Sequence, residues 1–507
     1  MRDPLITAEV GARWSSLSPA TQALLAPFLL PPAAPGSWLE LQQEQAATAR
    51  QAEPVEWVTL SRPGGRVKVW YQTRYPGDDA IAVRVLADLE DKVWGPLTEL
   101  VGHGPLPDDG LPNNGGDGLL DVYIVRIKAD GQAPAYEPIC AQRPSYLLIN
   151  GATKFLPATI VHEFMHAIIW ATPLKVCEWP EYRWLNEATA TWSEDFISPS
   201  YDTQQSEQAY AELFLDHCQF SLQTRGWDHE YGAYLWPFYL ARTYQPGLIR
   251  TIWDATASKE SLEAVDGAIP GGFLERWPEF AKLNLNREPV HDYYRWDGLT
   301  NGAYAEDLDG KIDSGVEQTI DLPAQVSALA AHNYRVAAFD AAVTKVRYEN
   351  GSRFASGAEP RAKVEALIKI EGQPWTTEDW TRLPNREFCR TKPGERIEEL
   401  MIIFSNSEWE NPDGELDPGT PAPLLRLSSV PCSCEDLAQV ENWTGQVVFS
   451  FTTSASSGEE SVSINHSATV NLLMAPDYQN SSVVAWQDAS LGGTGEVNDT
   501  HGDSTFS

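Results

Sequence analysis

Two histidines and a glutamate stand at fixed offsets within one apolar run of the sequence, VHEFMHAIIW, at residues 161–170. If this run is helical, His162 and His166 lie one turn apart on the same face, and both imidazoles can reach one ion. Glu163 lies about 100° around the helix, where it can meet a metal-bound water without displacing it. Zn²⁺ activates water in such a site, provided that a third protein ligand leaves one position open.

A second motif, WLNEATATWSEDF at residues 184–196, offers the missing ligand. Glu187 stands twenty-one positions after His166, in a second helical pattern. On a helix, Thr191 and Glu194 share the face of Glu187, so either side chain could orient a ligating histidine from behind. We therefore predict the two histidines and Glu187 as the metal ligands.

The competing interpretation is a buried helix that happens to contain histidines. A lone histidine on an apolar helix is more often a core residue than a ligand. With 9 histidines among 507 residues, a chance H-E-x-x-H would occur in roughly one such chain in a hundred. A preceding strand pattern, a long apolar helix and the downstream Asn-Glu pair lower that chance further, so the metal site is favoured.

The elements that must position these residues follow from the hydrophobic periodicity. Alternating apolar runs predict strands at 65–72, 121–127 and 145–150. Apolar residues at helical spacing predict helices at 80–102, 155–171 and Asn186–Phe196, with helical patterns continuing to about residue 280.

After about residue 315 the pattern changes to short β-rich runs between turn signals, which are typical of a β-sandwich. Because 507 residues exceed one core, we predict an α+β fold with several domains. These are an N-terminal segment at 1–55 (a propeptide or a strap), a catalytic domain with a small mixed sheet at 56–290, a β-sandwich accessory domain at 315–490 and a flexible tail at 491–507.

Composition narrows the class of protein. The formal net charge of −34 argues against a nucleic-acid partner, because phosphates would be repelled. No apolar run approaches the roughly 20 residues that a membrane-spanning helix needs. The sequence begins without a secretory signal, so we expect either a cytosolic protein or, preferably, the mature form of a secreted one.

The six cysteines favour secretion, since disulfides persist in oxidising compartments. We expect disulfides within an N-terminal and a C-terminal group of three, with pairings left open and buried free thiols as the alternative. The first group is Cys140, Cys177 and Cys218, and the second is Cys389, Cys432 and Cys434.

The metal motif resembles that of a known family. HEFMH at 162–166 followed by Asn-Glu at 186–187 is similar to the thermolysin-like zinc metallopeptidases, the gluzincins, whose third ligand is a glutamate often preceded by asparagine. The metzincin pattern is absent, because Ile169 and Thr172 stand where it requires glycine and histidine. The resemblance implies a zincin-like catalytic domain and covers about residues 65–260.

A narrower resemblance is to secreted bacterial metallopeptidases that carry a Glu-Ala-Thr-Ala-Thr-Trp motif before a β-sandwich, which residues 187–192 reproduce. This chain departs from thermolysin at Thr191, where an aspartate is usual, so Glu194 or Asp195 becomes the candidate partner of a ligating histidine. The acidic loops at 107–121 and 306–313 could bind Ca²⁺, but neither fits an EF-hand, and solvated turns are favoured.

The resemblance also implies a mechanism of peptide hydrolysis. Glu163 would act as the general base. A tyrosine or histidine outside the metal motif would stabilise the oxyanion; Tyr231 and His229 are the candidates, with Tyr234 behind them, and aromatic packing is the alternative for each. SYLLIN at 145–150 would be the edge strand that aligns an extended substrate.

These features predict a secreted zinc endopeptidase that acts on a protein or peptide. An aminopeptidase ranks lower, because no Gly-x-Met-Glu-Asn type of anchor for a free amine precedes the helix. The remaining alternative is a latent enzyme or a non-enzymatic surface adhesin that retains the zinc site, with residues 1–55 covering the cleft. Substrate specificity and oligomeric state do not follow from the sequence.

Overall fold

The protein has an α+β fold, which a computed structural model shows as two compact units, Met1–Ser428 and Ser429–Ser507. The range predicted as a single β-sandwich domain, 315–490, spans the boundary between them. The structure describes residues 10, 13–42, 56–136, 142–176, 179–197, 205–323, 325–416, 418–430, 432, 443–457, 460–476, 484–499 and 502–506.

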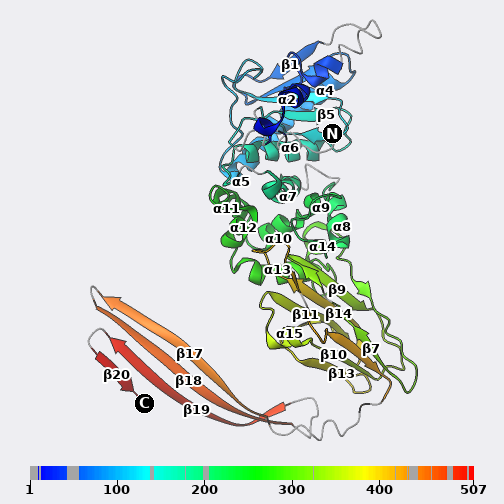
Figure 1. The fold of residues 1–507 in the computed structure, drawn as a ribbon, viewed down its shortest axis with the longest axis vertical. Coiled ribbons are helices and arrows are strands. Elements are labelled where there is room, and N and C mark those ends of the chain that lie inside the picture. The colour runs from blue at the N-terminus through cyan, green and yellow to red at the C-terminus, as the bar shows by residue number, and fades with distance from the viewer. Residues whose placement is uncertain are drawn as a thin grey trace. The chain divides into compact units, whose positions relative to one another are not determined.

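A five-stranded mixed sheet opens the first unit (Figure 1), with strand order β1-β2-β3-β5-β4. The central strands β2, β3 and β5 are parallel, whereas the outer strands β1 and β4 pair antiparallel with their neighbours. The strands are β1 (Trp57–Ser61), β2 (Val67–Gln72), β3 (Leu120–Val125), β4 (Gly131–Gln132) and β5 (Leu147–Asn150).

Both faces of the sheet are buried, because alternate residues of β3 and β5 point to opposite faces and pack in different cores. Val122 and Ile124 belong to the large core that contains the following helices, whereas Tyr123 and Val125 pack with Leu39 of the N-terminal segment. From the described part of that segment, residues 13–42, Ala33, Trp38 and Leu39 thus pack on the sheet face away from the helices. The segment contains η1 (Trp14–Ser16), α2 (Pro19–Leu25) and η2 (Ala26–Leu29).

Helices form the middle of the unit, and α6 packs along α7 (Figure 1). The helix predicted at 80–102 is interrupted at Leu89–Val93 by a π-helical turn, labelled η3. The helices are α4 (Asp78–Asp88), α5 (Trp94–Val101), α6 (Leu156–Trp170), α7 (Trp179–Ile197), α8 (Gln208–Asp216), α9 (His229–Gly232), α10 (Leu235–Thr243), α11 (Gly247–Ala255), α12 (Ser261–Ala268), α13 (Gly272–Leu283) and α14 (Asp292–Asp297).

Helix α7 starts seven residues before the predicted start at Asn186. Pro180 occupies its second position, and proline is tolerated in a first helical turn because its missing N–H would have no partner there. Pro180 therefore lies inside α7 and does not mark the start of the helix at Asn186.

Two sheets follow, with strand orders β13-β10-β16-β7 and β12-β11-β14-β9-β6, and their apolar side chains share one core. All neighbouring strands in them are antiparallel except β6 and β9, which are parallel. The strands are β6 (Glu306–Asp307), β7 (Glu317–Asp321), β9 (Ala330–Val336), β10 (Lys345–Glu349), β11 (Ala362–Ile370), β12 (Thr376–Asp379), β13 (Asn385–Cys389), β14 (Ile397–Asn406) and β16 (Leu424–Ser428). The pair β8 (Val326–Ser327) and β15 (Glu415–Leu416) and the short helix α15 (Ser352–Ser356) complete this part.

These sheets are joined to the helices by specific contacts. Trp277 Nε1 donates a hydrogen bond of 3.0 Å to the carbonyl of Ala330, and Lys282 Nζ lies 2.6 Å from Glu365 Oε1. Helix α13 carries both donors and packs on β14. The helical and β-rich parts up to Ser428 therefore belong to one compact unit.

The second unit contains a single antiparallel sheet, in the order β17-β18-β19-β20. Its strands are β17 (Trp443–Ser457), β18 (Glu460–Pro476), β19 (Val484–Asp499) and β20 (Gly502–Phe506). Within the predicted tail at 491–507, the described residues 491–499 and 502–506 belong to β19 and β20, which pair with each other.

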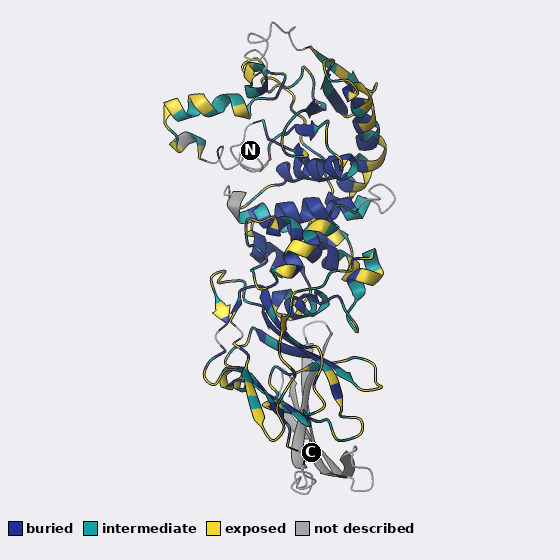
Figure 2. Ribbon diagram, turned by 90° about the vertical axis from the view of Figure 1, so that its right-hand side faces the viewer, coloured by how far each residue is buried: buried dark blue, intermediate teal, exposed yellow. Residues whose placement is uncertain are grey.

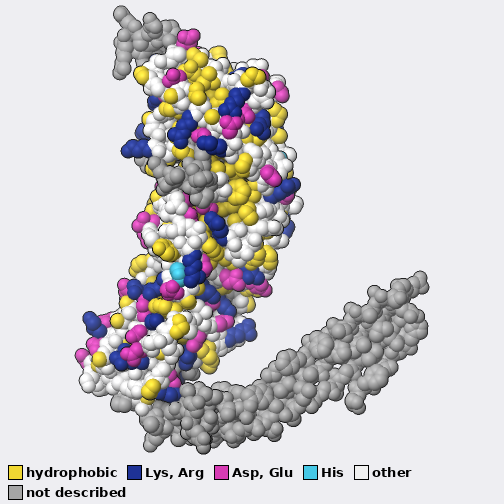
Figure 3. Space-filling model, turned by 180° about the vertical axis from the view of Figure 1, so that it is seen from behind, with side chains coloured by type: hydrophobic (Ala, Val, Ile, Leu, Met, Phe, Trp, Pro, Cys, Tyr) yellow, Lys and Arg dark blue, Asp and Glu magenta, His cyan; other side chains and the backbone are white. Residues whose placement is uncertain are grey.

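Cysteine usage agrees in part with the prediction. Cys389 and Cys432 of the C-terminal group are disulfide-bonded, whereas Cys218 is a buried free thiol. The other three cysteines lie outside the described residues. Within the described part of the chain, no helix is both long and apolar enough to cross a membrane. Acidic and basic side chains are interspersed on the face shown in Figure 3.

Candidate metal centre

The H-E-x-x-H run lies in α6, which is buried on all sides because it is packed between the sheet and α7 (Figure 2). Every residue of α6 except Pro157 is buried, including His162, Glu163 and His166. Trp170 at its end donates a hydrogen bond of 2.7 Å from Nε1 to the carbonyl of Ala133. This bond fixes α6 to the segment that follows the edge strand β4.

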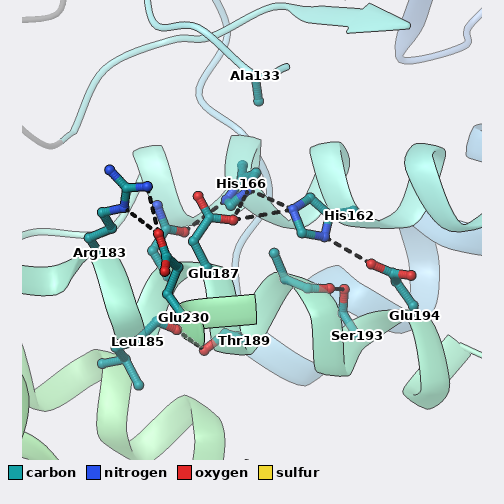
Figure 4. Close-up of polar contacts among 12 residues, drawn as sticks. Ala133, His162, His166, Arg183, Leu185, Glu187, Thr189, Ser193, Glu194 and Glu230 are labelled. Carbon is teal, nitrogen blue, oxygen red and sulfur yellow. Dashed lines mark hydrogen bonds and ion pairs between the residues drawn. The ribbon is translucent and has the colours of Figure 1, made fainter. Parts of the chain in front are cut away.

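Three ligand atoms converge between α6 and α7 (Figure 4). Nε2 of His162 and Nε2 of His166 are 3.0 Å apart, and each lies 3.4 Å from Oε2 of Glu187. A tetrahedral zinc ion with ligands at about 2.0–2.1 Å would separate them by about 3.3 Å. Among the described residues, this is the one group of three histidine, cysteine or acidic side chains close enough to hold a metal ion.

The outer nitrogen of each histidine has a partner on α7. His162 Nδ1 lies 2.9 Å from Oε1 of Glu194, and His166 Nδ1 lies 2.9 Å from Oδ1 of Asn186. Because both partners accept, each ring carries its proton on Nδ1 and turns the lone pair of Nε2 towards the other ring. Two lone pairs and a buried carboxylate then face one another, an arrangement that could hold a metal ion.

Thr191, Glu194 and Asp195 were the residues predicted to orient a histidine, and Glu194 is the one that contacts His162. The Thr191 hydroxyl is buried and has no hydrogen-bond partner among the described residues. Asp195 faces a different way, with Oδ2 lying 3.5 Å from Arg242. The contribution of Asn186 was not predicted, because the Asn-Glu pair indicated only the position of the third ligand.

The charges of the centre also favour a cation. Burial raises the pKa of Glu163 to about 7, although the two histidines oppose this shift. Burial alone would raise the pKa of Glu187, but the adjacent imidazoles hold it well below its usual range. Burial alone would lower the pKa of His162, yet the adjacent carboxylates of Glu187 and Glu194 raise it well above the usual value. These groups are stable together only with a positive charge among them.

A cavity of about 500 Å³ opens onto the centre. Its lining includes His162, Glu163 and Glu194, and the ring of Tyr231 stacks on His162 with centroids 5.8 Å apart. Tyr210 of α8 lines the same cavity and stacks on the other side of Tyr231 at 5.1 Å. A substrate group in this cavity would thus meet the predicted base, the metal position and two phenols.

The other predicted oxyanion candidates do not line the cavity. His229 stacks on Phe214 with centroids 4.8 Å apart, and its Nε2 lies 3.2 Å from the carbonyl of Ser221. Burial lowers the pKa of His229 to about 4, so this imidazole is neutral. Tyr234 is fully buried within the helical core. The geometry thus gives these two side chains the alternative role, which is aromatic packing.

The predicted edge strand is in the wrong position. Of the predicted residues 145–150, Leu147–Asn150 form β5, which lies inside the sheet between β3 and β4. The edge is β4, and it borders the cavity together with Ala129 and Asp130. A strand of two residues that includes Gly131 carries no periodic signal, so hydrophobic periodicity could not predict it.

The N-terminal segment does not cover the cavity with any of its described residues, 13–42, none of which belongs to the lining. In comparisons with known proteins, no protein-family model and no curated protein matched the sequence.

Proposed function

We infer that the protein is a zinc-dependent hydrolase of peptide bonds, with the two histidines of α6 and Glu187 of α7 as the metal ligands. The observation that carries this proposal is the convergence of two Nε2 lone pairs and a buried carboxylate at the wall of a cavity. The two oxygens of Glu187 accept no hydrogen bond from the described residues, which leaves them available to a metal ion. Nitrogen and carboxylate ligands in this number suit a catalytic zinc site.

Zinc in this position would lower the pKa of a bound water and polarise a substrate carbonyl. Glu163 then takes a proton as general base and returns it to the leaving amine. Burial raises the pKa of its carboxyl to about 7, a value suited to both transfers near neutral pH. Tyr231 is the phenol best placed to donate to the oxyanion, since it stacks on a ligating histidine.

The edge strand β4 supports a peptide as the substrate. An extended chain can pair with a free strand edge through its backbone, which places it along the cavity irrespective of its side chains. Gly131 lies at this edge and lines the cavity beside Glu163. We therefore favour an endopeptidase, to which the free ends of the substrate do not matter.

The proposed family and domain organisation rest on the metal motif and on the paired sheets. The H-E-x-x-H run and the Glu187 helix support a gluzincin with a zincin-like domain, and the paired sheets sharing one core support a β-sandwich as its accessory part. The disulfide-bonded Cys389 and Cys432 are compatible with an extracellular protein. Secretion is accordingly part of the proposal.

The test compares wild type with Glu163→Gln on an unstructured protein substrate at equal zinc content. Loss of the base should lower turnover by about 10²–10⁴-fold while zinc binding is retained. The sequence of the products separates internal cleavage from release of single N-terminal residues. If zinc is bound and wild type cuts no substrate, the adhesin or latent-enzyme alternative is correct; if both proteins cut equally, the role of Glu163 is wrong.

A further inference from the structure

The loop between α5 and β3 contains a second cluster of acidic groups. Residues 107–121, PDDGLPNNGGDGLLD, include four aspartates and lie at the N-terminal end of β3. Within this loop, Asn114 Nδ2 donates to the carbonyls of Asp108 at 3.3 Å and Asp117 at 3.1 Å. The loop is therefore an ordered structure, and the positions of its carboxylates are defined.

Two of the four aspartates are buried but differ in their partners. Asp121 is fully buried and accepts hydrogen bonds from Trp70 Nε1 at 2.7 Å and from the Tyr136 hydroxyl at 2.8 Å. Asp108 is only 3% exposed, yet neither of its carboxylate oxygens accepts a hydrogen bond from a residue that the structure describes. The Tyr136 hydroxyl also lies beside Asp108, but it has one proton to donate and gives it to Asp121.

The charges around these two side chains do not balance. Lys68 Nζ pairs with Asp117 and donates a hydrogen bond of 2.9 Å to the carbonyl of Gly115. Lys68 lies near Asp117 and Asp121, and both of these carboxylates lie near Asp108. One lysine among three aspartates leaves a formal excess of two negative charges. Burial raises the pKa of both Asp108 and Asp121 to about 6, and each carboxylate is still ionised at neutral pH. A buried, unpaired carboxylate is costly unless it binds a cation.

We propose that the 107–121 loop binds one calcium ion through Asp108, with Asp121 and backbone carbonyls of the loop completing its coordination. Every donor here is an oxygen, which suits a hard cation and excludes a preference for zinc. No three acidic side chains of the described loop converge on one point, so carbonyl and water oxygens must supply the remaining ligands. Calcium accepts six to eight oxygens in irregular geometry, whereas Mg²⁺ demands a near-ideal octahedron.

The loop is hydrogen-bonded through Asp121 to β2 and to the segment that follows β4. Tyr136 donates a hydrogen bond to Asp121. It follows Ala135, which forms a β-bridge with Ser145 close to β5, at the end of the segment that begins with β4. Trp70 on β2 holds the other side of Asp121. A cation at Asp108 would therefore fix the loop to both β2 and the edge segment, and it should stabilise the sheet.

The test uses the full chain, stripped with a chelator and reloaded with one equivalent of zinc. Ca²⁺ alone is then titrated by calorimetry and by thermal unfolding, with Mg²⁺ in parallel. We expect one calcium per chain and a rise in Tm of several degrees that Mg²⁺ does not reproduce, since a ligand of the native state raises Tm by mass action. Tb³⁺ bound at this site should emit when tryptophan is excited, because Trp70 contacts Asp121, and Ca²⁺ should displace it.

Asp108→Asn keeps the shape of the side chain but removes one negative charge, and it should weaken calcium binding by at least about tenfold. Asp109→Asn is the matched control, because Asp109 is the exposed neighbour in the same loop, and its calcium affinity should stay within about threefold of wild type. Failure of wild type to bind calcium would overturn the proposal. So would equal weakening by both substitutions, which would indicate general attraction of ions to an acidic surface.

Discussion

Gly131 of the edge strand lies directly against Glu163. A Cβ atom added at residue 131 would be 2.5 Å from Cγ of Glu163 and 2.7 Å from its Oε1, and also 2.7 Å from Cγ2 of Thr159. These separations are shorter than any that carbon atoms tolerate without movement. The strand that is proposed to align the substrate and the proposed general base are therefore in contact through the backbone of one glycine.

Gly131→Ala should displace the Glu163 carboxylate while leaving the zinc ligands in place. A shift of about 1 Å in a catalytic group costs on the order of 10²-fold in rate, so we expect kcat to fall by about 10–100-fold with zinc content unchanged. Gly95→Ala is the control, because a Cβ at residue 95 in α5 meets no atom within 4 Å. Steady-state kinetics and metal analysis of both variants check this. Unchanged kcat in Gly131→Ala would show that the contact is irrelevant to turnover.

Tyr231 and Tyr210 stack on each other, but only Tyr231 also stacks on a ligating histidine. If Tyr231 donates to the oxyanion, Tyr231→Phe removes an interaction made in the transition state. It should lower kcat by about 10²–10³-fold, with little change in KM. Tyr210→Phe should change kcat much less. A reversed order of the two effects would assign the donor to Tyr210, and equal small effects would exclude both phenols.

We expect the contact between His162 Nδ1 and Glu194 to increase the affinity of the site for zinc. Glu194→Gln keeps an acceptor oxygen but removes the charge that favours this orientation of the imidazole, so zinc affinity should fall by about 10–100-fold. Asp195→Asn is a matched control, since it removes the same charge one residue further on, where the carboxylate faces Arg242. Competition with a chromogenic chelator measures both affinities. Similar losses in the two variants would indicate a general effect of charge.

The convergence of His162, His166 and Glu187 was predictable because the spacing of the two histidines is a property of a single helix. His162 and His166 share a helix face at any position in a fold, and Glu187 with Glu194 repeats this relation on the next helix. The small mixed sheet was also predictable, since β2, β3 and β5 carry clear apolar patterns. For these elements the local sequence is sufficient.

The rest of the site depends on tertiary packing. Tyr210 meets Tyr231 only because α8 packs on α9, and nothing near residue 210 indicates that contact. His229 precedes Tyr231 by two residues, yet its ring turns into the core and Tyr231 lines the cavity. The edge position of β4 likewise follows from strand pairing over a long loop, for which a two-residue strand gives no signal.

Glu207, just before α8, is predicted to make the stability of the fold depend on pH. Burial raises the pKa of its carboxyl to about 8, and the nearby carboxylates of Glu194, Asp297 and Asp195 add to the shift. Arg242 lies against Asp195, one of these carboxylates. In the unfolded chain the pKa of glutamate is about 4.3. Between these two values the folded protein therefore binds more protons than the unfolded chain, and its stability must fall as the pH rises.

We therefore expect the Tm of the zinc-loaded protein to decrease between pH 5 and pH 8, and Glu207→Gln to flatten part of that decrease. At pH 8 the variant should be more stable than wild type, because it removes a buried group that must ionise, whereas at pH 5 the two should be similar. Glu212→Gln in the same helix is the control, since its side chain is exposed and its substitution should leave the pH profile unchanged. Parallel Tm profiles for wild type and Glu207→Gln would show that this carboxyl is ionised at pH 5 and already accommodated by its surroundings.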